Sequence, residues 1–130
     1  MKYLVDANVL SEPTKERPAS AVVNWLGQHE ADLAVNPIIL GELEYGILLL
    51  PTGKRRARLL TWFIQGVEHL RVLELDRQTA HVWAEVLAAL KRKGRAMPIK
   101  DSLISATALQ YELTVATRNT NDYRYAGVRL

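Results

Sequence analysis

The feature that most constrains this chain is a repeated alternation of short apolar segments with longer helical patterns. The apolar segments have the length and composition of buried strands, and they cover residues 2–5, 32–35, 72–75 and 114–116, with a possible fifth at 128–130. Helical patterns cover residues 19–29, 37–50, 52–66, 76–94 and 102–112. Strands that alternate with helices predict an α/β fold, with three α/β/α layers around a mostly parallel sheet of four to five strands.

Several of the predicted helices carry recognisable end signals. Asn36, followed by a proline, favours a helix start, because an Asn side chain can cap the first turn and proline suits the first helical position. Thr52 and Asp76 are predicted to cap the next two helices, and Gly94 to end the second of them. Asp101 is predicted to open the last long helix.

A length of 130 residues fits one domain, and we expect residues 1–130 to form it. With 48% hydrophobic and 24% charged residues, the composition is that of a folded globular protein. The absence of cysteine excludes disulfides, Cys-ligated zinc and Cys nucleophiles. Asp6 interrupts the N-terminal apolar run, and no apolar stretch approaches the ~20 residues of a membrane span, so we expect a cytoplasmic location.

Two glutamates lie inside the most apolar helical pattern, residues 37–50. Apolar or small residues surround both Glu42 and Glu44 at helical spacing, so periodicity does not decide which of them is buried. A half-buried carboxylate destabilises the fold unless a metal ion, an arginine or protonation compensates its charge. Either glutamate is therefore a candidate functional residue, and either can also simply face solvent.

Two aspartates stand at junctions between strands and helices. Asp6 follows the first strand and Asp101 opens a helix, so each can be an ordinary helix cap. Functional sites of parallel sheets, however, gather at the carboxyl ends of the strands, where Thr117 and Asn119 also fall. Convergence of both aspartates with Glu42 would require a divalent cation to offset their repulsion, and oxygen ligands favour Mg²⁺, with Mn²⁺ as a substitute.

Four sequence blocks follow one another over nearly the whole chain. They are LVDANVLS at residues 4–11, GELEYG at 41–46, DSLISATA at 101–108, and VATRN at 115–119 with DY at 122–123. Together they resemble the motifs of PIN domains, and their spacing is most similar to VapC-type toxins of toxin–antitoxin pairs. The resemblance implies a PIN-like fold and a metal-dependent endoribonuclease that hydrolyses phosphodiester bonds, in transfer or ribosomal RNA.

The resemblance also implies roles for individual positions. Three acids would hold Mg²⁺ and carry catalysis: Asp6, Glu42 and Asp101. Two polar neighbours would orient the acids or a water molecule: Asn8 and Thr117. Some relatives have an Asp where this chain has Asn119, so either Asn119 or Asp122 could serve as the fourth position.

Proteins of the VapC type are usually homodimers that a cognate VapB-like antitoxin inhibits, and the resemblance implies both partners. Apolar residues on the predicted helices can form such interfaces or simply pack in the core: Trp25, Leu48, Leu49, Leu50 and Trp62. The alternative function is a non-catalytic RNA- or protein-binding module of the same fold.

The net charge of +3 comes largely from two basic clusters, residues 54–58 and 91–95. Such clusters can follow a phosphate backbone, but they are also what a solvated helix face contains. The candidates for RNA contact are Lys54, Arg55, Arg56 and Arg118.

Overall fold

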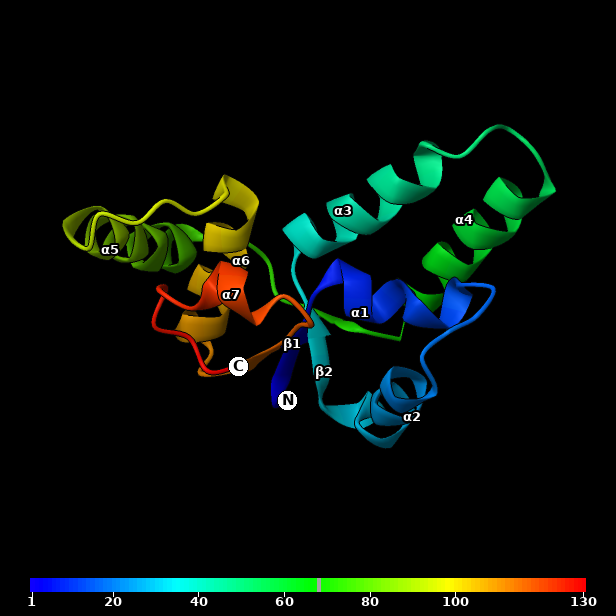
Figure 1. Ribbon diagram of the computed structural model, residues 1–130, viewed down its shortest axis with the longest axis horizontal. Helices are drawn as coiled ribbons and strands as arrows, with labels where there is room; N and C mark the ends of the chain where they lie inside the picture. The colour runs from blue at the N-terminus through cyan, green and yellow to red at the C-terminus, as the bar shows by residue number, and fades with distance from the viewer. Residues whose placement is uncertain (68) are drawn as a thin grey trace.

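The structure is a computed structural model that describes residues 1–67 and 69–130 (Figure 1). Its strands are β1 (Tyr3–Val5), β2 (Leu33–Val35), β3 (Arg71–Val72) and β4 (Thr114–Ala116). Its helices are α1 (Ala7–Ser11), α2 (Ser20–Gln28), α3 (Pro37–Leu48), α4 (Lys54–Val67), α5 (Arg77–Arg92), α6 (Ile99–Gln110) and α7 (Thr120–Tyr123), with 3₁₀ turns η1 (Glu12–Thr14) and η2 (Glu30–Asp32). Over the described ranges, no helix combines the length and the apolarity needed to cross a bilayer.

The four strands form one parallel sheet in the order β3-β2-β1-β4. In register, Tyr3 of β1 lies between Leu33 of β2 and Thr114 of β4, so β1 is an interior strand. A single parallel bridge between Thr114 and Arg129 stands where a fifth strand was expected. The predicted α/β class with a parallel sheet is confirmed.

Helices cover both faces of the sheet because successive residues of a strand point to opposite sides. Leu4 belongs to a core cluster with Ile39 of α3 and Ile104 of α6, whereas Val5 packs with Leu33 and with side chains of α2. Figure 1 shows α6 and α2 on opposite sides of the strands, with α3 beyond the upper ends of β1 and β2. This arrangement gives the predicted three layers, and α5 packs on the outer side of α6.

Three predicted boundaries are wrong. The strand expected at 72–75 is β3 at Arg71–Val72, and although the Leu73 N–H still donates to the carbonyl of Val35 (2.8 Å), the next two residues are exposed. Helix α4 begins at Lys54, and the hydroxyl of Thr52 accepts from the Arg56 side chain instead of capping the backbone. Helix α6 begins at Ile99, three residues earlier than the expected 102–112.

Asn36 caps α3 from inside the core, as its sequence context predicts. Its Oδ1 accepts from the backbone N–H of Ile39 (2.9 Å), and its Nδ2 donates to the hydroxyl of Thr107 in α6 (3.0 Å). The side chain is fully buried. Asn36 therefore fixes the start of α3 relative to α6 by hydrogen bonds on both of its polar groups.

We expect Asn36→Ala to lower the free energy of unfolding by about 2 kcal/mol, because it removes a helix cap and leaves the buried hydroxyl of Thr107 with one partner fewer. Urea unfolding followed by circular dichroism measures the change. The matched control is Asn24→Ala on the exposed side of α2, which should change stability little. Equal stability of the two variants would contradict the structural role of Asn36.

Candidate active site

A cleft of about 240 Å³ opens beside the carboxyl end of β1, where the starts of α1, α6 and α7 meet α3 (Figure 1). Its lining residues come from segments far apart in the sequence: Asp6, Ala7, Asn8, Glu42, Pro98, Lys100, Asp101, Asn119, Asp122 and Tyr123. The three acids singled out from the sequence therefore line one cleft, together with three of the four polar residues expected near them.

Asp6 directly follows β1 and is almost completely buried, with 6% of its surface exposed. Its backbone N–H donates to the carbonyl of Ala116 (3.1 Å), which ties it to the end of β4. Its Oδ1 accepts from the N–H of Val9 (2.9 Å), so Asp6 also caps α1. The capping interpretation and the placement at the cleft are both correct for this residue.

The structure distinguishes the two glutamates of α3. Glu44 is exposed, whereas the Glu42 side chain lines the cleft and is 27% exposed. Lys100 Nζ lies 3.6 Å from Glu42 Oε2, and Glu42 Oε1 is buried without a hydrogen-bond partner among the described residues. Burial raises the pKa of Glu42, and the negative charges of Asp101 and Asp6 add to the increase, while Lys100 opposes it.

Asp101 does not open its helix. It is the third residue of α6, whose N-cap position is Pro98, so the prediction that Asp101 begins the helix as its cap is wrong. Its Oδ1 instead accepts from the hydroxyl of Tyr123 (3.4 Å). Burial raises the pKa of Asp101, and the neighbouring charge of Asp122 raises it further.

The remaining predicted residues divide into two groups. Asn8, Asn119 and Asp122 line the cleft. Thr117 does not line it, but its hydroxyl accepts from the backbone N–H of Asn119 (3.0 Å). Arg118 faces away toward η1, with Nη1 3.5 Å from Glu12 Oε2.

Three RNA-contact candidates stand at the first turn of α4: Lys54, Arg55 and Arg56. In Figure 1 this turn lies at the far end of the α3–α4 pair, away from α6 and α7. Arg55 lines a different hollow, which it shares with Thr14 and Trp62. These basic side chains are therefore separated from the carboxylate cleft.

Sequence reasoning missed two residues that line the cleft, Lys100 and Tyr123, and one buried acid outside it, Glu12. Lys100 was overlooked because α6 was placed too late, which left this lysine in a loop instead of beside Asp101 on the first turn. Tyr123 is part of a recognised block, but only the fold places its hydroxyl against Asp101, and burial raises the pKa of that hydroxyl. Glu12 is a buried carboxylate whose pKa its contact with Lys15 lowers most.

The cleft provides oxygen donors, which suit a hard divalent cation. Within the described part of the chain, no three acidic or histidine side chains are grouped closely enough to form a ready-made metal site. Lys100 and Tyr123 engage Glu42 and Asp101 instead. Glu42 Oε1 is buried and has no hydrogen-bond partner among the described residues. Burial and neighbouring carboxylates disfavour the charged forms of Glu42 and Asp101, which is why their pKa values are raised. A cation between these carboxylates would offset that cost, so the residues fit one.

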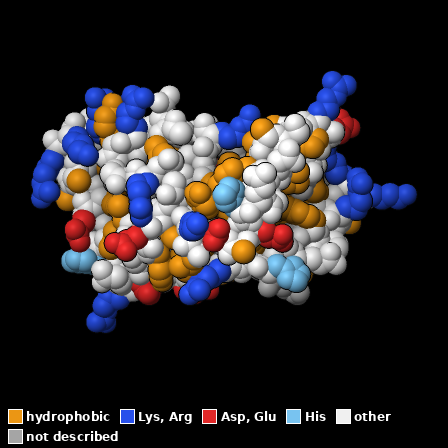
Figure 2. Space-filling view, turned by 90° about the horizontal axis from the view of Figure 1, so that it is seen from below, with side chains coloured by type: hydrophobic (Ala, Val, Ile, Leu, Met, Phe, Trp, Pro, Cys, Tyr) orange, Lys and Arg blue, Asp and Glu red, His pale blue; other side chains and the backbone are white. Residues whose placement is uncertain are grey.

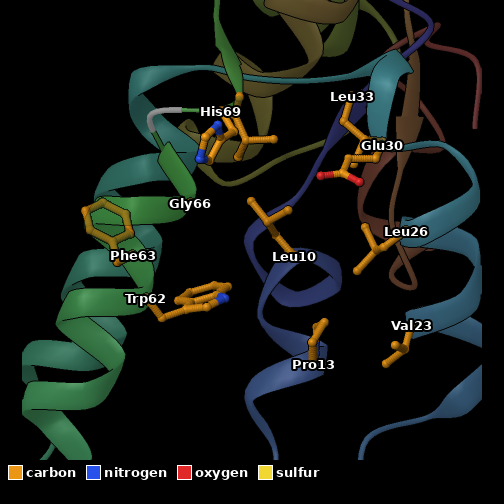
Figure 3. A pocket seen from close by; sticks show the side chains of 12 residues that line it. Leu10, Pro13, Val23, Leu26, Glu30, Leu33, Trp62, Phe63, Gly66 and His69 are labelled. Atoms are coloured by element: carbon orange, nitrogen blue, oxygen red, sulfur yellow. The ribbon is translucent and has the colours of Figure 1, made fainter.

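A second hollow is apolar and lies between α1, α2 and α4 (Figure 3). It measures about 320 Å³, and Leu10, Leu26, Trp62 and Phe63 form much of its wall. Trp62 is thus only partly buried. Of the other apolar interface candidates, Leu48 and Leu49 are exposed, whereas Trp25 and Leu50 are partly buried.

The fold and the cleft define a class of protein: α/β domains that gather carboxylates at the carboxyl end of a central parallel strand. Within that class, the chain belongs to the PIN-domain family, whose profile matches residues 3–128. Nucleases of this family generally depend on divalent metal ions. The resemblance seen in the four sequence blocks is therefore confirmed.

Individual relatives are similar over almost their whole length. Toxin FitB of Neisseria gonorrhoeae is 36% identical over 129 residues, which cover 96% of this chain and 93% of FitB. VapC ribonuclease Y4jK of Sinorhizobium fredii is 33% identical over 130 residues, 96% of this chain and 92% of that protein. The crystal structure of FitAcB from N. gonorrhoeae superimposes with a TM-score of 0.91 at 34% identity, covering 98% and 94% of the two chains.

Proposed function

We propose that this chain is a Mg²⁺-dependent endoribonuclease and the toxin of a toxin–antitoxin pair, and that residues 1–130 form one nuclease domain acting in the cytoplasm. The observation that carries the proposal is the single cleft to which Asp6, Glu42 and Asp101 converge from distant segments. Membership of the PIN family and similarity to relatives named toxin and VapC ribonuclease support the same activity.

Asp6, Glu42 and Asp101 would hold the cation, with Mn²⁺ as a possible substitute. Of the two candidates for the fourth position we favour Asp122, because its charge acts directly on Asp101. Asn8 and Asn119 line the same cleft and could orient a water molecule through their amide groups, with Thr117 holding the backbone of Asn119. A bound divalent cation would supply positive charge at the phosphoryl oxygens and acidify water.

The protein's own groups then determine the course of hydrolysis. A carboxylate of the cleft accepts the proton of the attacking water, the new bond forms between that water and phosphorus, and the bond between phosphorus and the 3′ oxygen breaks while that oxygen takes up a proton from solvent. The products are a 5′-phosphate and a 3′-hydroxyl. Tyr123 holds Asp101 in place through its hydroxyl, and Lys100 provides a positive charge at the cleft wall.

We place the antitoxin-binding site at the apolar hollow between α1, α2 and α4, which Figure 3 shows. Leu10, Trp62 and Phe63 present an apolar wall that an apolar segment of a VapB-like partner could cover. The exposed Leu48 and Leu49 at the end of α3 are available for a homodimer contact. The proposal therefore includes an antitoxin and a second copy of this chain as partners. The relative named as a toxin supports the antitoxin.

The experiment is RNA cleavage by the purified chain. We expect transfer or ribosomal RNA to be cut in Mg²⁺, and cutting to stop in EDTA and in Asp6→Ala and Asp101→Ala, because each variant removes one oxygen ligand. Product ends should carry 5′-phosphate. Thermal unfolding serves as a control, since Asp6→Ala also removes the cap of α1. RNA that is bound but uncut by the wild type in every divalent ion would favour a non-catalytic binding module instead.

A further inference from the structure

A hollow of about 290 Å³ adjoins the carboxylate cleft. Pro98 and Asp122 line both spaces, so the hollow lies directly beside the cleft. The far wall of the hollow is the turn that follows α5, including Gly94 and Arg95, and Tyr125 closes it from the segment after α7. A polymer chain that extends beyond the cleft on this side would lie in the hollow.

The last turn of α5 and the turn that follows it carry four exposed cations, Lys91, Arg92, Lys93 and Arg95, which we call the α5 turn patch. Gly94 has a positive φ of 65°, and this left-handed residue reverses the chain. Lys93 before this reversal and Arg95 after it both contact Tyr125, the residue that closes the hollow.

Two contacts hold these cations at the hollow. The Arg95 guanidinium lies over the Tyr125 ring, 4.3 Å from its centroid, and Lys93 Nζ donates to the Tyr125 carbonyl (3.1 Å). A guanidinium stacked on an aromatic ring forms a planar platform, and such platforms accept nucleic-acid bases by stacking while the charge attracts phosphate. The hollow thus combines a stacking platform for a base with positive charge for phosphate, the two features of single-stranded nucleic-acid sites.

The other basic cluster lacks this connection to the cleft. Lys54, Arg55 and Arg56 stand at the opposite end of the molecule, and Arg56 donates to Thr52. On the face that Figure 2 shows, Lys and Arg side chains lie at both ends of the molecule and also between them. At the α5 end, by contrast, the hollow that shares Pro98 and Asp122 with the carboxylate cleft has Arg95 in its wall.

We propose that the α5 turn patch binds the single-stranded RNA that flanks the scissile bond, with Lys93 and Arg95 on phosphates and the Arg95–Tyr125 pair against a base. This inference rests on the proposed ribonuclease function. It assigns RNA contact to the second basic cluster instead of to the start of α4.

The test compares two matched double variants, Lys93→Gln/Arg95→Gln at the α5 turn and Lys54→Gln/Arg55→Gln on α4. Binding of a fluorescent single-stranded 12-nucleotide RNA is measured in EDTA over a series of salt concentrations. We expect the α5 variant to weaken binding about tenfold near 0.1 M salt, and to reduce the slope of log K against log salt by about 1.4, because two phosphate contacts are lost. The α4 variant should match the wild type.

A third variant, Arg95→Lys, keeps the charge and removes the planar group. It should weaken binding of the normal strand and leave binding of an abasic strand unchanged, which a purely structural role of Arg95 would not produce. The proposal is overturned if the α4 variant carries the loss, or if the α5 variant only lowers the unfolding temperature and binds RNA like the wild type. RNA cleavage by the wild type is recorded in parallel. If the wild type cuts RNA but the α5 variant binds RNA normally, this inference fails and the proposed function stands. If the wild type does not cut RNA, the proposed function fails.

Discussion

Glu42→Gln is expected to reduce RNA cleavage by at least about 100-fold, the scale on which loss of one charged group at a metal-dependent or electrostatic site acts. The amide has the size of the carboxylate but no charge, so the change removes an oxygen ligand while it preserves packing on α3. Glu42 Oε1 is the buried oxygen that has no partner among the described residues, and it is therefore the group with most to gain from a cation. Single-turnover cleavage of RNA in Mg²⁺ measures the effect.

The matched control is Glu44→Gln, two residues along the same helix. Glu44 is exposed, so this variant removes the same charge from the same element and should cleave RNA at the wild-type rate. The pair of variants also excludes a general effect of net charge on RNA binding. If both variants are equally active, Glu42 is not a metal ligand; if both are equally impaired, the effect does not come from the cleft.

Asp101→Asn is expected to have opposite effects on the metal-free and the metal-loaded protein. Without metal, the variant loses a charge that burial and Asp122 disfavour, and Asn can still accept from Tyr123, so stability should rise by about 0.5–1 kcal/mol. With Mg²⁺ at 100 times its Kd, the wild type should gain about 2.7 kcal/mol, and the variant should gain much less. Urea unfolding in EDTA and in Mg²⁺ gives all four values.

The metal-free protein should also respond to pH in a defined direction. The pKa values of Glu42 and Asp101 are raised from their ordinary values of 4.5 and 3.8, so just above those values the folded state binds more protons than the unfolded state. Stability in EDTA should therefore fall as the pH rises through this window, and Asp101→Asn should reduce that fall. Glu12 and Asp76 have lowered pKa values and act in the opposite direction, below their ordinary values. An equal pH dependence in wild type and Asp101→Asn would contradict the assignment.

The layers and the parallel sheet could be predicted because their signals are local. Asn36 before a proline, Asp76 before a helical pattern and Gly94 after it each satisfy backbone groups within a few residues, and all three act as predicted. The boundaries of β3 and α6 could not be predicted in the same way. Pro98 starts α6 without any capping side chain, and the end of β3 depends on its pairing with β2.

For the site, the sequence indicated which acids to consider but not how they are held. Helix α3 is apolar on almost every side, so its pattern could not distinguish Glu42 from Glu44; that choice depends on where α6 lies. Contacts between distant segments, such as Lys100 with Glu42 and Tyr123 with Asp101, leave no periodic trace in the sequence. They follow only from the packing of α3, α6 and α7.

The position of β1 inside the sheet has a consequence during protein synthesis. Asp6 is synthesised long before β4, but the strand that precedes Asp6 pairs with β4, and the backbone N–H of Asp6 donates to the carbonyl of Ala116. Asp101 and Tyr123 are also made late. A nascent chain therefore cannot assemble the cleft before Tyr123 has been translated, so an incomplete copy would lack the site proposed to cut RNA.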